Sequence, residues 1–317
     1  MGNQKKNSIS RIFSFIFFIS LGLAGAAMIV LYFTFKEIKF AADKSFFTNS
    51  KKSKIQFDEY NKVFNVLVLG IDTFNTKFNG RSDSVMIVSI DHENEKIKIT
   101  SLMRDTWVKI PKKSSNTWNR LNAAYSIGGA VLAVETIERN FGLKIHKFVS
   151  VDFVGFPKII NSLGGINITL TPSEVAYINA KSENSSLRGA GVFSLNGEQT
   201  LHHASNRDSI GADRDRIKRQ QDVVKAIFEK IKLAKVSELM SLVFNLMKFV
   251  KTDFKISEIM ELSKNISKYL KFQILHYRLP TDDNIKDAVI GGRMVLTVNN
   301  FEKCRRDLHS YIFETKN

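Results

Sequence analysis

Several short segments of this 317-residue chain are apolar at both odd and even positions. They include residues 63–71 (VFNVLVLGI), 84–90 (SVMIVSI) and 96–103 (KIKITSLM). Strands buried on both faces have this pattern, whereas a strand with one solvated face alternates apolar and polar residues. The sequence therefore predicts a central sheet that is covered on both sides.

Segments with helical spacing alternate with further strand-like segments. Residues 128–141 and 154–165 are expected to be helical, and the second segment ends in a pair of glycines. Residues 147–153 and 166–170 are expected to be strands. This alternation predicts an α/β fold, an αβα sandwich with a mixed central β-sheet.

The remainder of the chain is expected to belong to the same domain. The stretch near residues 172–195 is polar and looks variable. Amphipathic helices are expected at 237–250 and 256–270. Residues 274–280 (ILHYRLP) and 294–299 (MVLTVN) are expected to be edge strands.

An uncharged apolar run, residues 12–35, precedes all of these segments. It is about 24 residues long, enough to span a hydrocarbon core of about 30 Å. A cleaved signal peptide has a shorter apolar region and a small-residue cleavage site. We therefore expect one transmembrane signal-anchor (12–35), a cytoplasmic tail (1–11), a juxtamembrane linker (36–60) and an extracytoplasmic domain (61–317).

The charge around this apolar run does not decide its orientation, because lysines occur on both sides of it. We expect the N-terminus inside the cell, since the short tail resembles that of a signal-anchor and long domains translocate largely regardless of charge. The expected location is the cell membrane, crossed once.

The composition is strongly basic, with 47 Lys and Arg against 31 Asp and Glu and a net charge of +16. This balance favours polyanionic partners such as anionic lipid, phosphate-bearing substrates or nucleic acid. One cysteine, Cys304, excludes an internal disulfide and a cysteine-cluster metal site. No helix-turn-helix with a basic recognition helix is apparent, and a domain outside the membrane cannot reach DNA, so we expect no nucleic-acid partner.

A helix predicted from residue 213 carries polar residues on its apolar face. On a helical wheel, Asp213, Arg216 and Gln220 lie on the same side as Ile217 and the later apolar positions. The opposite, solvent-facing side is predicted to carry Arg214, Lys218, Arg219, Asp222, Lys225 and Glu229. Asp213 alone is as consistent with a helix N-cap as with a functional residue.

Further charged residues follow the predicted strands. They are Asp72 in LGIDT, Arg81 and Asp83 in RSDSVMI, Arg104 and Asp105 in SLMRDT, and Arg120 in WNRLNAAY. By strand parity, Arg81 and Asp83 are expected on the face that buries Val85 and Ile87. Each residue taken singly fits a turn or a surface ion pair. Together they predict one crevice outside the strand ends, suited to a phosphate ester and Mg²⁺.

The order and spacing of these motifs resemble the LytR-CpsA-Psr family. The resemblance rests on LGIDT, RSDSVMIVSI, SLMRDTWVKIP, LNAAYSIGG, VDFVGFPKIINSLGGINI, LNGEQTLHHASNRD and DRDRIKRQQ. It covers roughly residues 63–232, and the N-terminal signal-anchor fits the family's usual layout.

The resemblance implies a Mg²⁺-dependent phosphotransferase, with Mn²⁺ as an alternative ion. Such an enzyme moves a glycopolymer from a polyprenyl (undecaprenyl) pyrophosphate carrier to the 6-hydroxyl of N-acetylmuramic acid in peptidoglycan. The implied metal ligands are Asp72 and Asp83. The implied pyrophosphate-binding residues are Arg81, Arg104, Arg120, Arg207, Arg216 and Gln220. The implied catalytic residues are Arg104, Asp105 and Asp213, and either aspartate could accept the proton of the acceptor hydroxyl.

Three positions depart from the family pattern. Met103 replaces a proline, Arg120 replaces a lysine, and Ser205 stands where an arginine normally begins an Arg-x-Arg pair. The change at Ser205 leaves open a protein that captures the lipid-linked polymer without transferring it. A second alternative is a diphosphatase, in which water replaces the acceptor hydroxyl. His202 and His203 are adjacent, which is poor spacing for one metal ion.

Overall fold

The central element of the computed structural model is a mixed β-sheet. The structure describes residues 63–73, 80–111, 116–183, 185–206, 212–233, 243 and 245–314, without the side chains of Ala212 and Asp213. Within these ranges the largest sheet has six strands in the order β10-β3-β2-β1-β6-β9. The strands are β1 (Val63–Asp72), β2 (Arg81–Asp91), β3 (Lys96–Leu102), β6 (Lys147–Asp152), β9 (Val250–Thr252) and β10 (Gln273–Leu279).

The sheet mixes two strand directions. β1 pairs antiparallel with β2 and parallel with β6. β3 pairs antiparallel with β2 and parallel with β10, and β9 closes the other edge against β6. Parallel neighbours need long crossovers that contain helices, and the helices accordingly cover both faces.

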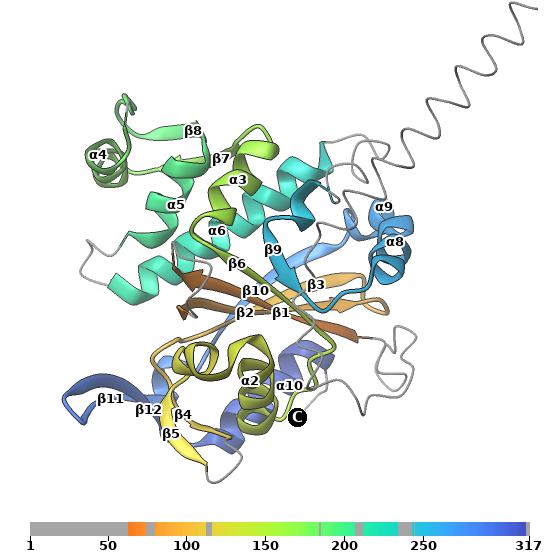
Figure 1. Ribbon diagram of the computed structural model, residues 1–317, viewed down its shortest axis with the longest axis vertical. Coiled ribbons are helices and arrows are strands. Elements are labelled where there is room, and N and C mark those ends of the chain that lie inside the picture. The colour runs from red at the N-terminus through yellow and green to blue at the C-terminus, as the bar shows by residue number, and fades with distance from the viewer. Residues whose placement is uncertain are drawn as a thin grey trace, which may run out of the picture. The chain divides into compact units, whose positions relative to one another are not determined.

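One face of the sheet packs against α2 (Ala123–Phe141) and α10 (Phe301–Phe313), which lie on the same side in Figure 1. Its core combines sheet residues such as Leu69 and Ile87 with Ile137 and Phe141 of α2 and Leu308 of α10. All of these side chains are almost fully buried. This face therefore forms the larger hydrophobic core.

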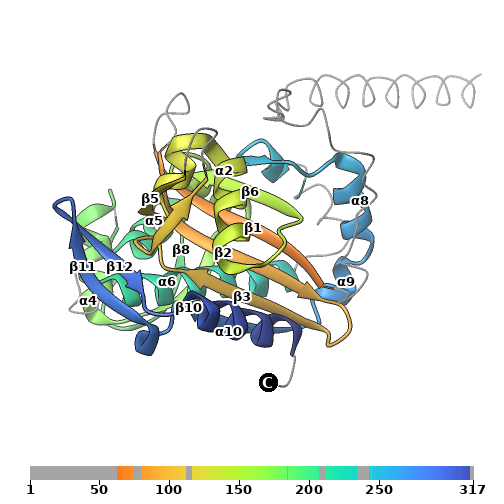
Figure 2. The same ribbon diagram turned by 90° about the horizontal axis from the view of Figure 1, so that it is seen from below.

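The opposite face is covered by α3 (Gly155–Ser162), α5 (Gly197–Ser205), α6 (Ala212–Lys232), α8 (Ile256–Lys264) and α9 (Ile266–Tyr269). Figure 2 shows the same layers from below. Met86 and Ile99 of the sheet contact Val224 and Phe228 of α6 on this side. The sheet strands thus bury apolar residues on both faces, and the prediction of a mixed αβα arrangement is confirmed.

Three two-stranded sheets are attached to this framework within the described ranges. They are β4 (Trp107–Ile110) with β5 (Thr117–Arg120), β7 (Ile166–Leu170) with β8 (Gly191–Leu195), and β11 (Ile285–Ile290) with β12 (Arg293–Val298). Residues 294–299 were expected to form an edge strand of the same domain, and residues 294–298 do belong to a strand, β12, whose partner is β11. The Gly291–Gly292 turn joins β11 and β12 directly, and the positive φ of both glycines suits a tight two-residue hairpin turn.

Two further segments, residues 172–195 and 237–250, can be compared with the sequence analysis. The polar stretch near 172–195, to which no element was assigned, contains helix α4 (Pro172–Lys181) and β8. Thr171 and Glu174 form a capping box at the start of α4, and Pro172 occupies its first turn. Much of the helix expected at 237–250 lies outside the described residues, and the chain has already entered β9 at Val250.

A buried ion pair fastens the C-terminal helix to the sheet. The Nζ atom of Lys98 on β3 donates to a carboxylate oxygen of Asp91 at 2.8 Å and to the carbonyl oxygen of Ile312 at 2.6 Å. The side chains of Lys98 and Asp91 are each 1% exposed. A buried charge is stable only when it is paired and hydrogen-bonded in this way.

The predicted cytoplasmic tail, signal-anchor and linker, residues 1–60, lie outside the described residues. Across the part of the chain that is described, no helix combines the length and apolarity that crossing a membrane requires.

Candidate functional site

A cavity of about 380 Å³ lies on the α6 side of the sheet. Its walls are mainly apolar and come from β1, β2, β6, α3, α5 and α6. They include Val68, Met86, Val149, Val151, Phe153, Phe156, Ile159, Leu201, Ala204, Val223, Val224, Ile227 and Val250. This volume is within the range of small-molecule binding sites.

A second apolar cavity of about 280 Å³ shares Val149 and Val250 with the first. It continues along β2 through Val88 and Ile90 and reaches Phe228 of α6. The α6 face of the sheet therefore carries two adjoining apolar cavities.

Polar side chains enter the first cavity from four elements. Asp72 ends β1, Asp83 lies near the start of β2, and Arg216 and Gln220 occupy successive turns of α6. Ser205, the last residue of α5, also lines the cavity, and its hydroxyl donates to the carbonyl oxygen of Leu201 at 2.8 Å. The structure thus gathers residues that are up to about 150 positions apart in one cavity, as the motifs predicted.

Asp83 reaches this cavity because of an irregularity in strand pairing. Gly70 pairs with Ser84 and Ile71 pairs with Ser82, so Asp83 is the extra residue of a β-bulge. Val85 packs in the core on the opposite face, whereas Asp83 lines the cavity. The expected shared parity of these two residues is therefore wrong, because the bulge shifts the alternation by one position.

Four charged residues form a chain of ion pairs that starts at Asp83. The guanidinium of Arg104 lies 2.7 Å from a carboxylate oxygen of Asp83. Its Nε donates to one oxygen of Asp105 at 3.2 Å, and Arg120 donates to the other at 3.2 Å. The side chains of all four residues are only 14–19% exposed. Asp105 thus orients two arginines with its two oxygens.

Arg81 occupies a different position from the other predicted arginines. It pairs across the strands with Asp72, but its side chain is exposed at the start of β2. Arg207 and the side chain of Asp213 lie outside the described residues. The structure therefore places seven of the predicted residues in or beside the cavity: Asp72, Asp83, Arg104, Asp105, Arg120, Arg216 and Gln220.

Polar residues on the apolar face of α6 line the cavity. Arg216 is 2% exposed and lines the cavity together with Val223. Arg214 and Lys218 are exposed, as predicted. Arg219, however, was expected to face solvent but is only 7% exposed. Its guanidinium donates to the carbonyl oxygen of Asn206, which follows α5. The cause is α5, which lies beside α6 and covers this position.

Arg219 also belongs to a buried charged group beside the cavity. Its Nη1 lies 3.8 Å from Glu174 of α4, and Nδ1 of His203 lies 3.9 Å from the same carboxylate. Burial lowers the pKa of His203 to about 4, against the opposing effect of Glu174. The imidazole is therefore neutral at physiological pH, and its buried position follows from packing between α4 and α5.

Sequence reasoning did not identify Asp152, which also lines the cavity. Its Oδ1 accepts the backbone N–H groups of Val154 at 3.1 Å and Gly155 at 2.7 Å, at the start of α3. The signal was present in the sequence, because Asp152 ends its strand in VDF just as Asp72 ends β1 in LGID.

The described residues contain no cluster of three or more His, Cys, Asp or Glu side chains that could hold a metal ion. Asp72 and Asp83 nevertheless line the same end of one cavity. Mg²⁺ is commonly held by one or two carboxylates together with substrate phosphates. The residues therefore fit a magnesium ion that shares its ligands with a bound phosphate.

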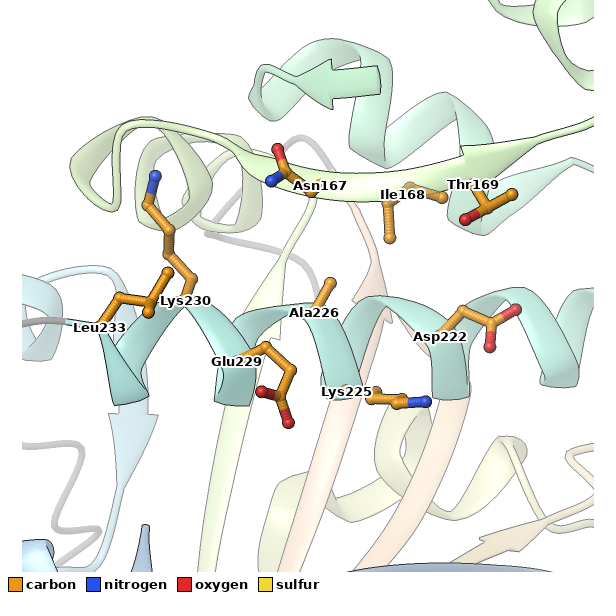
Figure 3. A pocket seen from close by; sticks show the side chains of 9 residues that line it. All are labelled: Asn167, Ile168, Thr169, Asp222, Lys225, Ala226, Glu229, Lys230 and Leu233. Atoms are coloured by element: carbon orange, nitrogen blue, oxygen red, sulfur yellow. The ribbon is translucent and has the colours of Figure 1, made fainter. Parts of the chain in front are cut away.

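A separate open depression of about 270 Å³ lies between β7 and the outer side of α6 (Figure 3). Asn167 and Thr169 come from β7, and Asp222, Lys225 and Glu229 come from α6. The residues that line it include none of the predicted site residues. The apolar cavity lined in part by Asp72, Asp83, Arg216 and Gln220 is therefore the candidate functional site.

The fold and this cavity together define an α/β protein suited to a ligand with an apolar body and a charged head. A family model described as the LytR_cpsA_psr family matches residues 29–303. The chain belongs to the LytR-CpsA-Psr family.

Two curated relatives are polyisoprenyl-teichoic acid–peptidoglycan teichoic acid transferases. Enterococcus faecalis TagU is 32% identical over 250 residues, which span 77% of this chain and 79% of that protein. Bacillus subtilis TagV is 33% identical over 235 residues, which span 71% of this chain and 58% of that protein. This chain thus spans most of the first relative but little more than half of the second.

Solved structures share the fold. The crystal structure of B. subtilis TagV superposes with a TM-score of 0.64 at 28% identity, covering 80% of this chain and 98% of that chain. B. subtilis YwtF (TagT) with bound octaprenyl pyrophosphate superposes with a TM-score of 0.62 at 21% identity, covering 83% of this chain and 93% of that one. At this identity the second likeness shows the fold.

Proposed function

We propose that the protein is a glycopolymer–peptidoglycan ligase, a phosphotransferase of the extracytoplasmic side of the membrane. It would move a glycopolymer from a polyprenyl (undecaprenyl) pyrophosphate carrier to the 6-hydroxyl of N-acetylmuramic acid in peptidoglycan. The names of TagU and TagV as teichoic acid transferases support the reaction class. The octaprenyl pyrophosphate bound to TagT supports the class of donor.

The observation that carries the proposal is that the cavity combines apolar walls with a few charged and polar side chains. Its walls are apolar, and Asp72, Asp83, Arg216 and Gln220 lie among them. A polyprenyl pyrophosphate has the matching form, a long apolar chain with a diphosphate at one end. Arginine binds phosphate oxygens in a bidentate manner, and the water-poor surroundings of Arg216, which is 2% exposed, strengthen such a contact.

The transfer forms one bond and breaks another at a single phosphorus atom. The acceptor hydroxyl oxygen bonds to the phosphorus that carries the glycopolymer, while the bond to the bridging oxygen breaks and polyprenyl phosphate leaves. Arg104 and Arg216 would stabilise the charge that develops on the phosphate oxygens. The proton of the hydroxyl passes to a carboxylate.

We assign this proton to Asp213 rather than Asp105. Both carboxylate oxygens of Asp105 already accept hydrogen bonds, from Arg104 and from Arg120. Such an arrangement fits a residue that positions arginines. Asp213 lies one helical turn before Arg216 on α6, and helical periodicity assigns the two positions to the same side of the helix.

Asp72 and Asp83 are the residues that would hold Mg²⁺, with Mn²⁺ as an alternative because it prefers the same oxygen ligands. When bound, such an ion offsets the charge of the diphosphate. The location that fits this function is the cell membrane, with residues 12–35 as the anchor and the cavity outside the cytoplasm.

The test is turnover by the full chain with a lipid-pyrophosphate-linked polymer as donor and a muropeptide as acceptor. The proposal expects polymer joined to the muropeptide, a strong loss in Asp83→Asn, and wild-type turnover in Asp222→Asn, a carboxylate on the outer side of α6. Release of polymer phosphate without joining would indicate a diphosphatase. Tight donor binding without any product would indicate a binding protein.

A further inference from the structure

The tip of the β11–β12 hairpin exposes apolar side chains. Val289 is 66% exposed, Met294 is 62% exposed and Ile290 is 37% exposed. Val289 and Met294 are cross-strand partners, so they lie side by side on one face of the tip. The turn between the strands is Gly291–Gly292, which adds no side chain to the tip.

The base of this hairpin is fixed to the charged residues beside the cavity. The backbone N–H of Leu296 donates to the carbonyl oxygen of Asp105 at 2.9 Å, and Thr106 forms a parallel bridge with Leu296. Asp282, just before β11, lies 3.0 Å from Arg214 in the first turns of α6. The hairpin is therefore joined to the ion-pair chain of Asp83, Arg104, Asp105 and Arg120 and to the start of α6, and its tip projects away from the sheet (Figure 1).

The chemistry of the tip limits what can cover it. Three aliphatic side chains on a two-stranded hairpin are far fewer than the roughly 20–30 residues that each side of a typical stable protein–protein interface contributes. Arg293 is exposed and pairs with Ile290, and Lys286 is exposed on the same hairpin, against one exposed carboxylate at Asp287. Aliphatic residues flanked by long basic side chains suit a membrane interface, where the cation reaches the lipid phosphates.

We propose that the β11–β12 tip inserts into the lipid bilayer and docks the rim of the cavity against the membrane. This inference rests on the proposed function, because a carrier lipid has to enter the cavity from a bilayer. The net charge of +16 favours anionic lipid surfaces. If residues 12–35 anchor the chain, as proposed above, a weak insertion suffices, since tethering raises the effective concentration of the tip at the membrane.

Trp118 is an exposed aromatic residue on a neighbouring hairpin. It is 52% exposed on β5, and β5 pairs with β4, which contacts β12. Tryptophan is enriched at membrane–water interfaces, because its ring is largely apolar and its N–H is polar. We expect Trp118 to lie at the level of the headgroups when the tip is inserted.

Brominated lipids test the docking directly. The full chain carrying Val289→Trp is reconstituted into phosphatidylethanolamine–phosphatidylglycerol vesicles whose acyl chains are brominated near the headgroup, with Trp107 and Trp118 replaced by Phe. The matched control is Val192→Trp on β8, where Val192 is 68% exposed in the two-stranded β7–β8 sheet. Docking predicts a blue-shifted emission and severalfold greater quenching at position 289 than at position 192.

Equal quenching at the two positions would overturn the proposal. A second measurement uses the double variant Val289→Ser with Met294→Ser, both at exposed positions that leave the core intact. Docking predicts a raised KM for donor embedded in vesicles and an unchanged KM for donor in detergent, and equal effects in both would contradict it. The quenching does not require turnover, so a failure of the proposed transferase activity would be seen separately.

Discussion

The role of Asp105 can be decided by replacing it with asparagine. Its two carboxylate oxygens accept from Arg104 and Arg120, each at 3.2 Å. The asparagine side chain retains one oxygen that can accept and loses the other, so one contact to a guanidinium is removed. A hydrogen bond to a charged group contributes about 1.5–3 kcal/mol. We therefore expect Asp105→Asn to lower kcat/KM by about 10- to 100-fold, since each ~1.4 kcal/mol is tenfold.

The assay is kcat/KM as a function of pH for the wild type and for Asp105→Asn. A positioning role predicts a lower rate at every pH with the limbs of the profile unchanged. A loss of about 10⁴-fold or more together with disappearance of the acidic limb would refute the reasoning and identify Asp105 as the general base. Asp213→Asn is the matched comparison, and we expect it to remove that limb.

Three further predictions concern the donor site and stability. Arg207→Ala should lower turnover by about 100-fold. Ser205→Arg should tighten donor binding by at least about tenfold, because Ser205 lines the cavity and a guanidinium there adds a charge-assisted hydrogen bond. The measurement is the donor Kd at one Mg²⁺ concentration, and an Arg207→Ala variant that binds like the wild type would show that this segment does not contact the diphosphate. Lys98→Met should lower the free energy of unfolding by about 3–5 kcal/mol in urea, because it leaves a buried carboxylate unpaired, whereas Lys96→Met at a partly exposed pair should cost less than about 1 kcal/mol. Burial lowers the pKa of His203 from 6.5 to about 4, so as the pH falls the unfolded chain binds this proton before the folded chain does. The contribution of His203 to the free energy of unfolding should therefore be constant above pH 6.5 and fall by up to ~3 kcal/mol between pH 6.5 and 4. The variant His203→Gln should flatten that decline.

The sequence by itself determined the fold class and most of the residues around the cavity. Strands that bury both faces are visible as continuous apolar runs, and α6 is visible from its 3.6-residue period. Asp72 and Arg104 could be found because acids and arginines at strand ends stand out against apolar neighbours. These features are local, so they can be recognised within a window of roughly ten to twenty residues.

Tertiary structure alone decided how those residues face one another. A β-bulge between neighbouring strands turns Asp83 into the cavity, and no periodicity within its own strand records that shift. Arg219 is buried because α5 covers a side of α6 that is polar in sequence, and Asp105 orients two arginines because β5 returns Arg120 beside it. Each of these outcomes depends on contacts between segments far apart or on register, which hydrophobic patterning does not specify.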